Sequence, residues 1–181
     1  MLTTNHIELA EQYCRQYHQG QFRRASNEPY EKHPFMVREI LQRYGYEDVV
    51  TQCVALLHDT IEDTTLRLEE ITDRFGFEVS NGVYVLSRNK GKNLDAGELS
   101  GEEYKQRLLF ARPMIQRVKI ADMVDNTRTL EQLRPTGIAR KIEEAEQFYI
   151  PLGRRIAPLM VNELVRNIEH YQEKKQGYVG V

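Results

Sequence analysis

The spacing of apolar residues constrains the fold of this 181-residue chain more than any other feature. Apolar side chains recur every three or four positions over nearly the whole length, which is the period of helices that bury one face. No stretch alternates apolar and polar residues as a half-buried strand does. The length suits one compact domain with a sizeable core. We therefore predict a single all-α domain over residues 1–181, folded as a bundle of about eight helices.

Local signals indicate where these helices begin and end. Asn5 with Glu8, and Ser100 with Glu103, have the spacing of capping boxes that open helices. Glycines mark helix ends, and prolines fit first turns. Residues 88–99 are polar and rich in turn formers, so they are predicted to form a loop. The predicted helices cover residues 5–19, 34–44, 47–61, 65–76, 78–87, 100–130 with a break or restart at Pro113, 138–149 and 152–173, and the apolar helix 47–61 is expected to lie at the centre.

Charge and composition exclude several classes of protein. The formal net charge is -2 and the isoelectric point is near 6.2, so the whole chain has no general attraction to nucleic acid or anionic membranes. The longest apolar run, residues 53–57, is too short to span a membrane, and the N-terminus lacks the pattern of a signal peptide. Cys14 and Cys53 are expected to be buried free thiols because they lack metal or redox spacing. A cytoplasmic protein fits these features.

The segment LHDTIED, residues 57–63, places an acidic run at the end of an apolar helix. Charged groups rarely lie beside a core unless they are paired or bind a metal. His58 and Glu62 are four residues apart and share one helix face, and Asp59 and Asp63 share the adjacent face. Taken alone, this segment is equally compatible with a solvated helix end.

Two further elements complete a candidate metal site. His33 precedes a proline at the start of a predicted helix, and Asp122 lies in an otherwise apolar helix, with Asn126 one turn later. Together with His58 and Asp59 they form a set of two imidazoles and two carboxylates. Such mixed ligands suit Mn, Fe, Zn or Mg, and Mn²⁺ fits the balance of nitrogen and oxygen best. An ion held this way supplies hydroxide near neutral pH and binds a phosphate oxygen.

Four sequence blocks, taken together, resemble the HD-domain hydrolases of the stringent response, which act on guanosine tetraphosphate alarmones. The resemblance is strongest to the free-standing small alarmone hydrolases. The blocks follow the family's order over residues 13 to 155. They are HQGQFRR (18–24) with PY (29–30) and HP (33–34), LHDTIEDT (57–64), KIAD (119–122) with Asn126 and RTL (128–130), and Glu144 with YIPL (149–152).

The resemblance implies a role for each matching residue. His33, His58, Asp59 and Asp122 would bind the metal. Glu62 and Asp63 would position or activate the attacking water. Arg23 would stack on the purine, Arg24 would lie near the phosphates, and Asn126 and Tyr149 would line the nucleotide pocket. The implied reaction removes the 3′-pyrophosphate of an alarmone nucleotide. For Tyr149, a purely structural place in the core is an equal alternative.

Three positions depart from the family pattern. Asn27 replaces the usual glycine, and Met123 and Asp125 replace an arginine and a histidine. Asp125 is expected to add negative charge near a phosphate site. These departures put guanine specificity in doubt, so both ppGpp and ppApp are candidate substrates.

Two other functions stay open at this point. The chain is also compatible with another HD phosphohydrolase, acting on NADPH or a 5′-nucleotide, or with a catalytically silent nucleotide-binding module. Intact Glu62 and Asp63 argue against the silent module. About 50 residues follow Asn126, enough for closing helices only, so we expect hydrolysis without nucleotide synthesis. The sequence predicts no oligomeric state.

Overall fold

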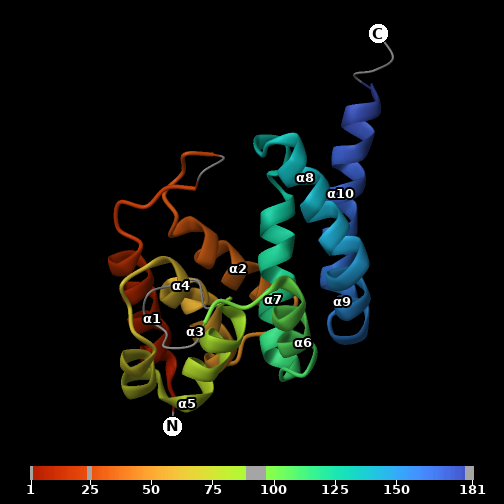
Figure 1. Cartoon of the computed structure of the whole chain (residues 1–181). Coiled ribbons are helices and arrows are strands. Elements are labelled where there is room, and N and C mark those ends of the chain that lie inside the picture. Colours follow the sequence, from red (N-terminus) through yellow and green to blue (C-terminus); the bar gives the residue numbers. More distant parts are fainter. Residues whose placement is uncertain (1, 24–25, 89–96, 178–181) are drawn as a thin grey trace.

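The computed structural model describes residues 2–23, 26–88 and 97–177 (Figure 1). Within these ranges every regular element is helical, apart from one isolated bridge between Phe22 and Pro29. The all-α prediction is therefore confirmed. The α-helices are α1 Thr4–Tyr17, α2 Lys32–Arg43, α3 Val49–Leu57, α4 Thr60–Asp63, α5 Leu68–Leu86, α6 Gly101–Leu109, α7 Pro113–Thr127, α8 Pro135–Glu144, α9 Ile150–Ile156 and α10 Pro158–Gly177, with a 3₁₀ turn Leu130–Gln132 and a π-helical segment Ala145–Tyr149.

Helix α7 runs through the middle of the bundle, with α1, α3 and α5 on one side and α9 and α10 on the other (Figure 1). It packs against α2, α3, α9 and α10. Helix α3 is the second buried element, and every residue from Thr51 to Leu57 is inaccessible to solvent. The predicted central helix thus shares the core with α7, whose polar Asp122 and Asp125 are also buried.

Helices α3 and α5 approach each other closely at Gly82. A Cβ atom at this position would lie 2.7 Å from Cγ2 of Val54. Val54 is a β-branched residue with little rotamer freedom in a helix. The absence of a side chain at Gly82 therefore sets the distance between these two helices.

Several predicted boundaries agree with the structure. Ser100 and Glu103 form the predicted capping box of α6, and Pro113 lies in the first turn of α7. Gly76 has φ +78° and divides α5 into two helical halves, as its position in the sequence predicted. Of the predicted loop 88–99, residues 89–96 lie outside the described part of the chain.

Other boundaries were predicted wrongly. The first helix begins after Thr3, whose backbone N–H donates to Nδ1 of His6 at 3.1 Å, so Asn5 and Glu8 do not form its cap. The helix predicted over residues 47–61 ends at Leu57 and restarts at Thr60. The helix predicted over 152–173 is likewise divided, between α9 and α10.

Both cysteines are buried and unpaired, as predicted. Cys14 lies on α1 and Cys53 on α3, two helices that pack together. Burial raises the pKa of each thiol to about 12. None of the described helices has the length and apolar composition needed to cross a membrane.

Candidate metal centre

The interruption between α3 and α4 places His58 and Asp59 at the site. The His58 imidazole donates from Nδ1 to the carbonyl oxygen of Ala55 at 2.8 Å. The Thr60 hydroxyl donates to the carbonyl oxygen of Leu57 at 2.6 Å. These bonds satisfy the last carbonyls of α3 and hold His58 at the end of a buried helix. Asp59 follows as the residue that precedes α4.

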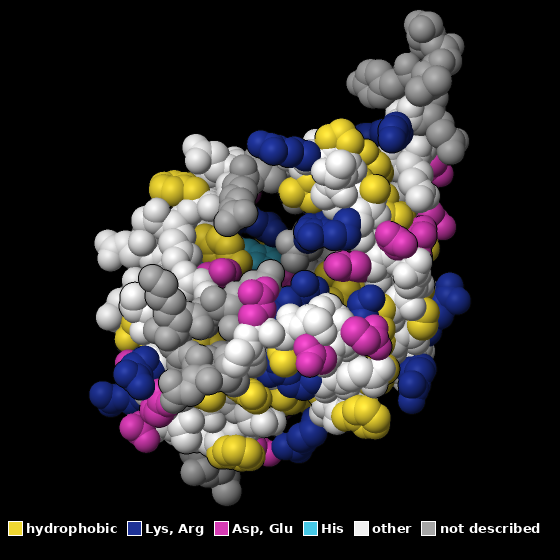
Figure 2. Space-filling view, in the orientation of Figure 1, with side chains coloured by type: hydrophobic (Ala, Val, Ile, Leu, Met, Phe, Trp, Pro, Cys, Tyr) yellow, Lys and Arg dark blue, Asp and Glu magenta, His cyan; other side chains and the backbone are white. Residues whose placement is uncertain are grey.

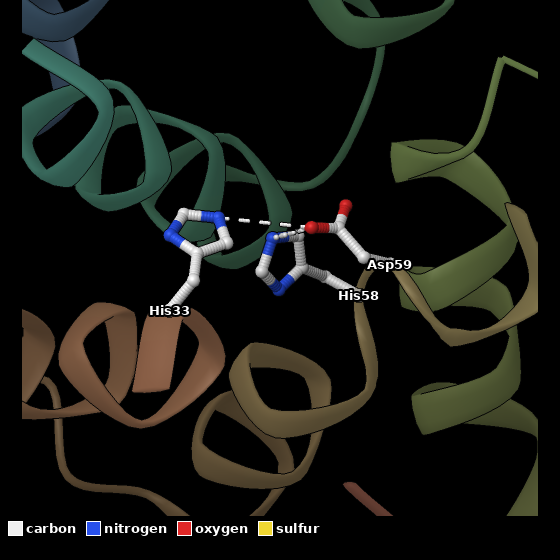
Figure 3. A group of neighbouring side chains, drawn as sticks. All are labelled: His33, His58 and Asp59. Atoms are coloured by element: carbon white, nitrogen blue, oxygen red, sulfur yellow. Dashed lines mark ion pairs between the residues drawn. The ribbon is translucent and has the colours of Figure 1, made fainter. Parts of the chain in front are cut away.

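His33 reaches the same point from the first turn of α2, and Asp122 reaches it from the middle of α7. The His33, His58 and Asp59 side chains point toward one another (Figure 3), and their ligand atoms lie within 4.8 Å of one another. Nε2 of His33 is 3.6 Å from Oδ2 of Asp59, and Nε2 of His58 is 3.1 Å from the same oxygen. Oδ1 of Asp122 lies 3.0 Å from Nε2 of His33. Three of the four predicted ligands therefore converge, and the fourth, Asp122, contacts one of them, His33.

The chemistry of His58 fits a bound cation. Its Nδ1 faces a carbonyl oxygen, which only accepts, so Nδ1 carries the proton and Nε2 presents a lone pair. Nε2 is buried and makes no hydrogen bond to any described residue, although the Asp59 carboxylate lies beside it. A buried lone pair aimed at a carboxylate is unfavourable without a proton or a metal ion between them. The residues present therefore suit a divalent ion.

Charge within the site is balanced by close pairs. Burial lowers the pKa of His33, but its hydrogen bonds with Asp122 and Asp125 outweigh burial and raise that pKa to about 9. Nζ of Lys119 donates to Oδ2 of Asp122 at 2.6 Å. Burial raises the pKa of Asp122, but the Lys119 charge and His33 hold it well below its usual range. The Asp122 carboxylate is therefore ionised, as a metal ligand must be.

Tyr30 joins the site, and the sequence analysis did not identify it. Its hydroxyl lies 2.7 Å from Oδ2 of Asp59 and 3.1 Å from Oδ2 of Asp63, and its ring stacks on His18 with centroids 4.8 Å apart. Burial and the charge of Asp59 raise the pKa of Asp63 to about 6. Tyr30 therefore links a predicted ligand to a predicted catalytic carboxylate.

Glu62, the other predicted catalytic residue, faces a different neighbour. Its carboxylate accepts from the backbone N–H of Arg88 at 2.7 Å and lies 3.4 Å from the hydroxyl of Ser87. These contacts hold the end of α5 next to α4. The acidic pair thus diverges, with Asp63 beside Tyr30 and Glu62 beside the segment that follows α5.

Three of the predicted ligands, His33, Asp59 and Asp122, lie in the wall of a cavity of about 310 Å³, which is at the small end of the range for ligand pockets. Figure 2 shows a histidine at the bottom of a hollow, with Lys and Arg side chains around it. Lys141 of α8 lines the cavity and was not predicted, because nothing in its local sequence distinguishes it from a solvated helix residue. The lining residues are Arg23, Ser26, Tyr30, His33, Asp59, Lys119, Asp122, Asn126, Thr129, Gln132, Leu133 and Lys141.

The predicted substrate contacts are only partly brought together. Arg23 and Asn126 line the cavity and bond to each other, from NH2 of Arg23 to Oδ1 of Asn126 at 3.0 Å. Tyr149 is buried, and its ring centre lies 5.8 Å from Nζ of Lys119. Arg24 lies outside the described residues.

A larger surface hollow, of about 550 Å³, lies between the N-terminal residues and the Gly76 kink. Its lining contains none of the predicted site residues. The smaller cavity is the candidate site because it contains the convergent titratable groups.

Comparison with known proteins gives matches over most of the chain. A family model described as "HD domain" matches residues 10–157. A GTP pyrophosphokinase from Streptomyces coelicolor is 31% identical over 202 residues, which cover 99% of this chain and 23% of that protein. The GTP pyrophosphokinase rsh of Brucella melitensis is 39% identical over 147 residues, 80% of this chain and 19% of its own length. The chain therefore spans about a fifth of these relatives.

A solved structure shows the same fold. It is that of a metazoan ortholog of SpoT, described as hydrolysing ppGpp and acting in starvation responses. It superposes with a TM-score of 0.79 over 94% of this chain and 98% of its own, at 21% sequence identity. At that identity the likeness concerns the arrangement of the helices.

Proposed function

The chain belongs to the HD-domain family, and from this premise we propose that it is a divalent-metal-dependent phosphohydrolase that removes the 3′-pyrophosphate of alarmone nucleotides. The observation that carries the proposal is the convergence of His33, His58 and Asp59, with Asp122 beside His33, at a cavity that His33, Asp59 and Asp122 line. The similarity to part of GTP pyrophosphokinases and to the fold of a ppGpp hydrolase supports the choice of substrate.

The residues suited to hold the ion are His33, His58, Asp59 and Asp122. Their nitrogen and oxygen donors favour Mn²⁺, although other divalent ions suit such a set. When bound, the ion supplies a Lewis acid that lowers the pKa of water and neutralises phosphate charge. Tyr30 restrains Asp59 through its hydroxyl and so keeps one oxygen aimed at the two imidazoles.

The cations of the cavity suit a polyphosphate. Arg23, Lys119 and Lys141 line it, in a chain whose formal net charge is -2. Lys119 is committed to Asp122, so Lys141 is the lysine best placed for phosphate oxygens. The planar guanidinium of Arg23 is also suited to stacking on a purine.

Hydrolysis then proceeds by displacement at phosphorus. The oxygen of a water forms a bond to the phosphorus attached to the ribose 3′-oxygen, and the bond between that phosphorus and the 3′-oxygen breaks. Asp63 accepts a proton from the water, and the 3′-oxygen leaves and takes up that proton from Asp63 to become the ribose hydroxyl. Glu62 fixes the end of α5 against the site and completes the acidic environment of the water. The products are pyrophosphate and a 5′-phosphorylated nucleoside.

The proposal is tested with a substrate panel in the presence of Mn²⁺. The purified chain and its Asp59→Asn variant are incubated with ppGpp, pppGpp, ppApp, NADPH and 5′-nucleotides, and pyrophosphate and phosphate are measured separately. We expect pyrophosphate from ppGpp and ppApp, with less than about 100-fold preference between them, or about 3 kcal/mol. Asp59→Asn should lose both bound metal and turnover.

Two results would contradict the proposal in different ways. Release of phosphate from NADPH or a 5′-nucleotide, without action on alarmones, would leave a phosphohydrolase with another substrate. Metal binding and nucleotide binding without any turnover would instead identify a silent binding module.

A further inference from the structure

Asp125 makes two charged contacts on one oxygen. Its Oδ2 accepts from Nδ1 of His33 at 2.6 Å and from NH1 of Arg23 at 2.9 Å. Its side chain is 8% exposed. A buried carboxylate is stable only when its charge is paired and hydrogen-bonded; here the guanidinium of Arg23 pairs the charge and His33 donates a second hydrogen bond. The carboxylate thus touches both a predicted metal ligand and a predicted nucleotide contact.

The first of these contacts fixes His33. Because a carboxylate accepts only, Nδ1 of His33 carries the proton and Nε2 is the atom directed at Asp59 and Asp122. Metal-binding histidines commonly donate their second nitrogen to a carboxylate, which sets both the ring orientation and the basicity of the ligand nitrogen. Asp125 occupies this position for His33.

The second contact fixes Arg23. One nitrogen of its guanidinium donates to Asp125, and the other donates to Oδ1 of Asn126 at 3.0 Å. Nδ2 of Asn126 in turn donates to Oδ1 of Asp122, the oxygen that faces His33. The contacts therefore form a closed ring through Arg23, Asp125, His33, Asp122 and Asn126. A change at any member is transmitted to both neighbours.

We propose that Asp125 is a positioning residue that orients His33 and Arg23 together, and that it thereby couples binding of the metal to binding of the nucleotide. The charge of Asp125 is paired with the guanidinium of Arg23, so it does not act as a repulsive group near the phosphates. The nucleotide half of this inference rests on the proposed function. The metal half rests on the geometry of His33 alone.

Coupling between two sites is reciprocal. If a bound nucleotide orders Arg23, and an ordered Arg23 helps to hold the His33 imidazole in the orientation that metal binding needs, then the nucleotide strengthens metal binding. Bound metal must then strengthen nucleotide binding by the same factor. Neither Arg23 nor Asp125 is among the four proposed ligands, so a metal-binding defect in their variants would have to be transmitted through His33 or Asn126.

The test uses the full chain and three variants. Asp125→Asn keeps the size of the side chain and removes its charge. Arg23→Gln removes the second partner and leaves His33 and Asp125 in place. The control, Asp73→Asn, neutralises an exposed aspartate on α5. Binding of Mn²⁺ is measured by calorimetry, and binding of Co²⁺ by its visible absorption, which reports ligand geometry without turnover. Circular dichroism verifies the fold.

We expect Asp125→Asn to weaken Mn²⁺ binding about 10-fold or more and to alter the Co²⁺ spectrum. Arg23→Gln should weaken Mn²⁺ binding about 3-fold or more, and Asp73→Asn should match the wild type. GDP, a product of the proposed reaction, should bind the wild type more tightly with Mn²⁺ than without it. In Asp125→Asn this difference should disappear.

The outcomes separate the two proposals. Wild-type Mn²⁺ affinity and an unchanged Co²⁺ spectrum in Asp125→Asn would overturn the positioning role while leaving the proposed function intact. If Arg23→Gln binds Mn²⁺ as the wild type does, the coupling is absent. Arg23→Gln also decides the question if Asp125→Asn does not fold. Failure of the wild type to bind any divalent ion would remove the proposed function itself.

Discussion

The two acidic residues that follow His58 and Asp59, Glu62 and Asp63, have different neighbours and are proposed to have different roles. Asp63 has a raised pKa and contacts Tyr30, whereas Glu62 accepts from the backbone of Arg88. A carboxylate beside a proposed ligand suits proton transfer, and one that holds a neighbouring segment suits positioning. Both are proposed to act on the water rather than on the metal.

Asp63→Asn and Glu62→Gln should therefore keep the metal and lose turnover. Each is expected to lower kcat about 10²-fold or more with Mn²⁺ content unchanged: Asp63→Asn because a general acid–base group is lost, and Glu62→Gln because the end of α5 is no longer held next to α4. Metal analysis of the purified variants, alongside steady-state kinetics, checks this. If metal and activity are lost together, the residue concerned is a ligand instead.

A substitution at Lys141 tests the proposed binding of phosphate. Burial lowers the pKa of Lys141, and it lines the cavity that is proposed to bind the polyphosphate. A charge-assisted hydrogen bond contributes about 1.5 to 3 kcal/mol, so Lys141→Gln should raise KM about 10-fold or more and reduce the salt dependence of kcat/KM. The exposed Arg140 on the same helix, changed to Gln, serves as control. Equal KM values in the two variants would exclude Lys141 from substrate binding.

The sequence predicted the residue types of the site better than their partners. His33, His58, Asp59 and Asp122 were predicted as ligands from their residue types together with the resemblance of the blocks that contain them, and the structure brings His33, His58 and Asp59 together with Asp122 against His33. Tyr30 and Lys141 were missed, and Asp125 was expected only to repel phosphates. Their contacts depend on residues distant in the chain: Asp125, for example, bonds to His33 across 92 positions. Local patterns do not carry that information.

At the scale of the helices, the boundaries at Gly76 and Ser100 were predicted from local chemistry, whereas the cap predicted at Asn5 was wrong and the break at His58 was not predicted. Gly76 ends a helical half because its φ of +78° is costly for other residues, and Ser100 caps α6 with its own side chain. The break at His58 has no neighbouring glycine or proline that would have indicated a helix end in the sequence. Side chains stabilise it instead, because His58 and Thr60 donate to the carbonyl oxygens of Ala55 and Leu57.

The contact between α3 and α5 gives a prediction at this scale. Gly82→Ala should lower the free energy of unfolding by about 1 to 3 kcal/mol, because Val54 has to move to accommodate the new methyl group. Urea denaturation measures the change. Adding Val54→Ala to this variant should cost less than Val54→Ala does in the wild type.

Gly137→Ala on α8 is the matched control. Its Cβ would meet only the Cβ of Leu133, at 4.0 Å, and alanine is the better helix former. It should leave stability unchanged or raise it. An equal loss of stability in both variants would show that close packing at Gly82 is not the cause.

Across the whole molecule, Glu163 joins helices that are distant in the sequence. Its carboxylate, on α10, accepts from the Tyr44 hydroxyl at 2.8 Å and from the Arg43 and Arg128 guanidinium groups. Tyr44 and Arg43 lie at the end of α2, and Arg128 follows α7. One side chain that is 13% exposed thus holds the last long helix to the two that carry His33 and Asp122.

This network predicts a pH-dependent stability. Burial raises the pKa of Glu163, but the hydrogen bonds from Arg128 and Tyr44 outweigh it and lower the pKa below its usual 4.5. A depressed pKa adds stability that is complete above pH 4.5 and lost as the pH falls through the folded-state value. Glu163→Gln should therefore cost about 1 to 3 kcal/mol at pH 7, and the difference should shrink below pH 4.5.

Chemical denaturation at several pH values measures this difference, with Glu169→Gln, an exposed glutamate on the same helix, as control. A deficit that stays constant down to the lowest pH at which the chain folds would show that packing, and not the ionised carboxylate, is responsible.

The two buried thiols, Cys14 and Cys53, allow local opening of the structure to be measured by chemical labelling. An alkylating reagent reacts with a thiolate, and neither Cys14 nor Cys53 presents one while it stays buried. The labelling rate therefore measures how often the helices around these thiols open locally. Because α3 ends at His58, an ion bound there favours the state in which the thiols are buried and should lower the labelling rate. The rate measured with a simple thiol reagent would then report whether the metal site is occupied.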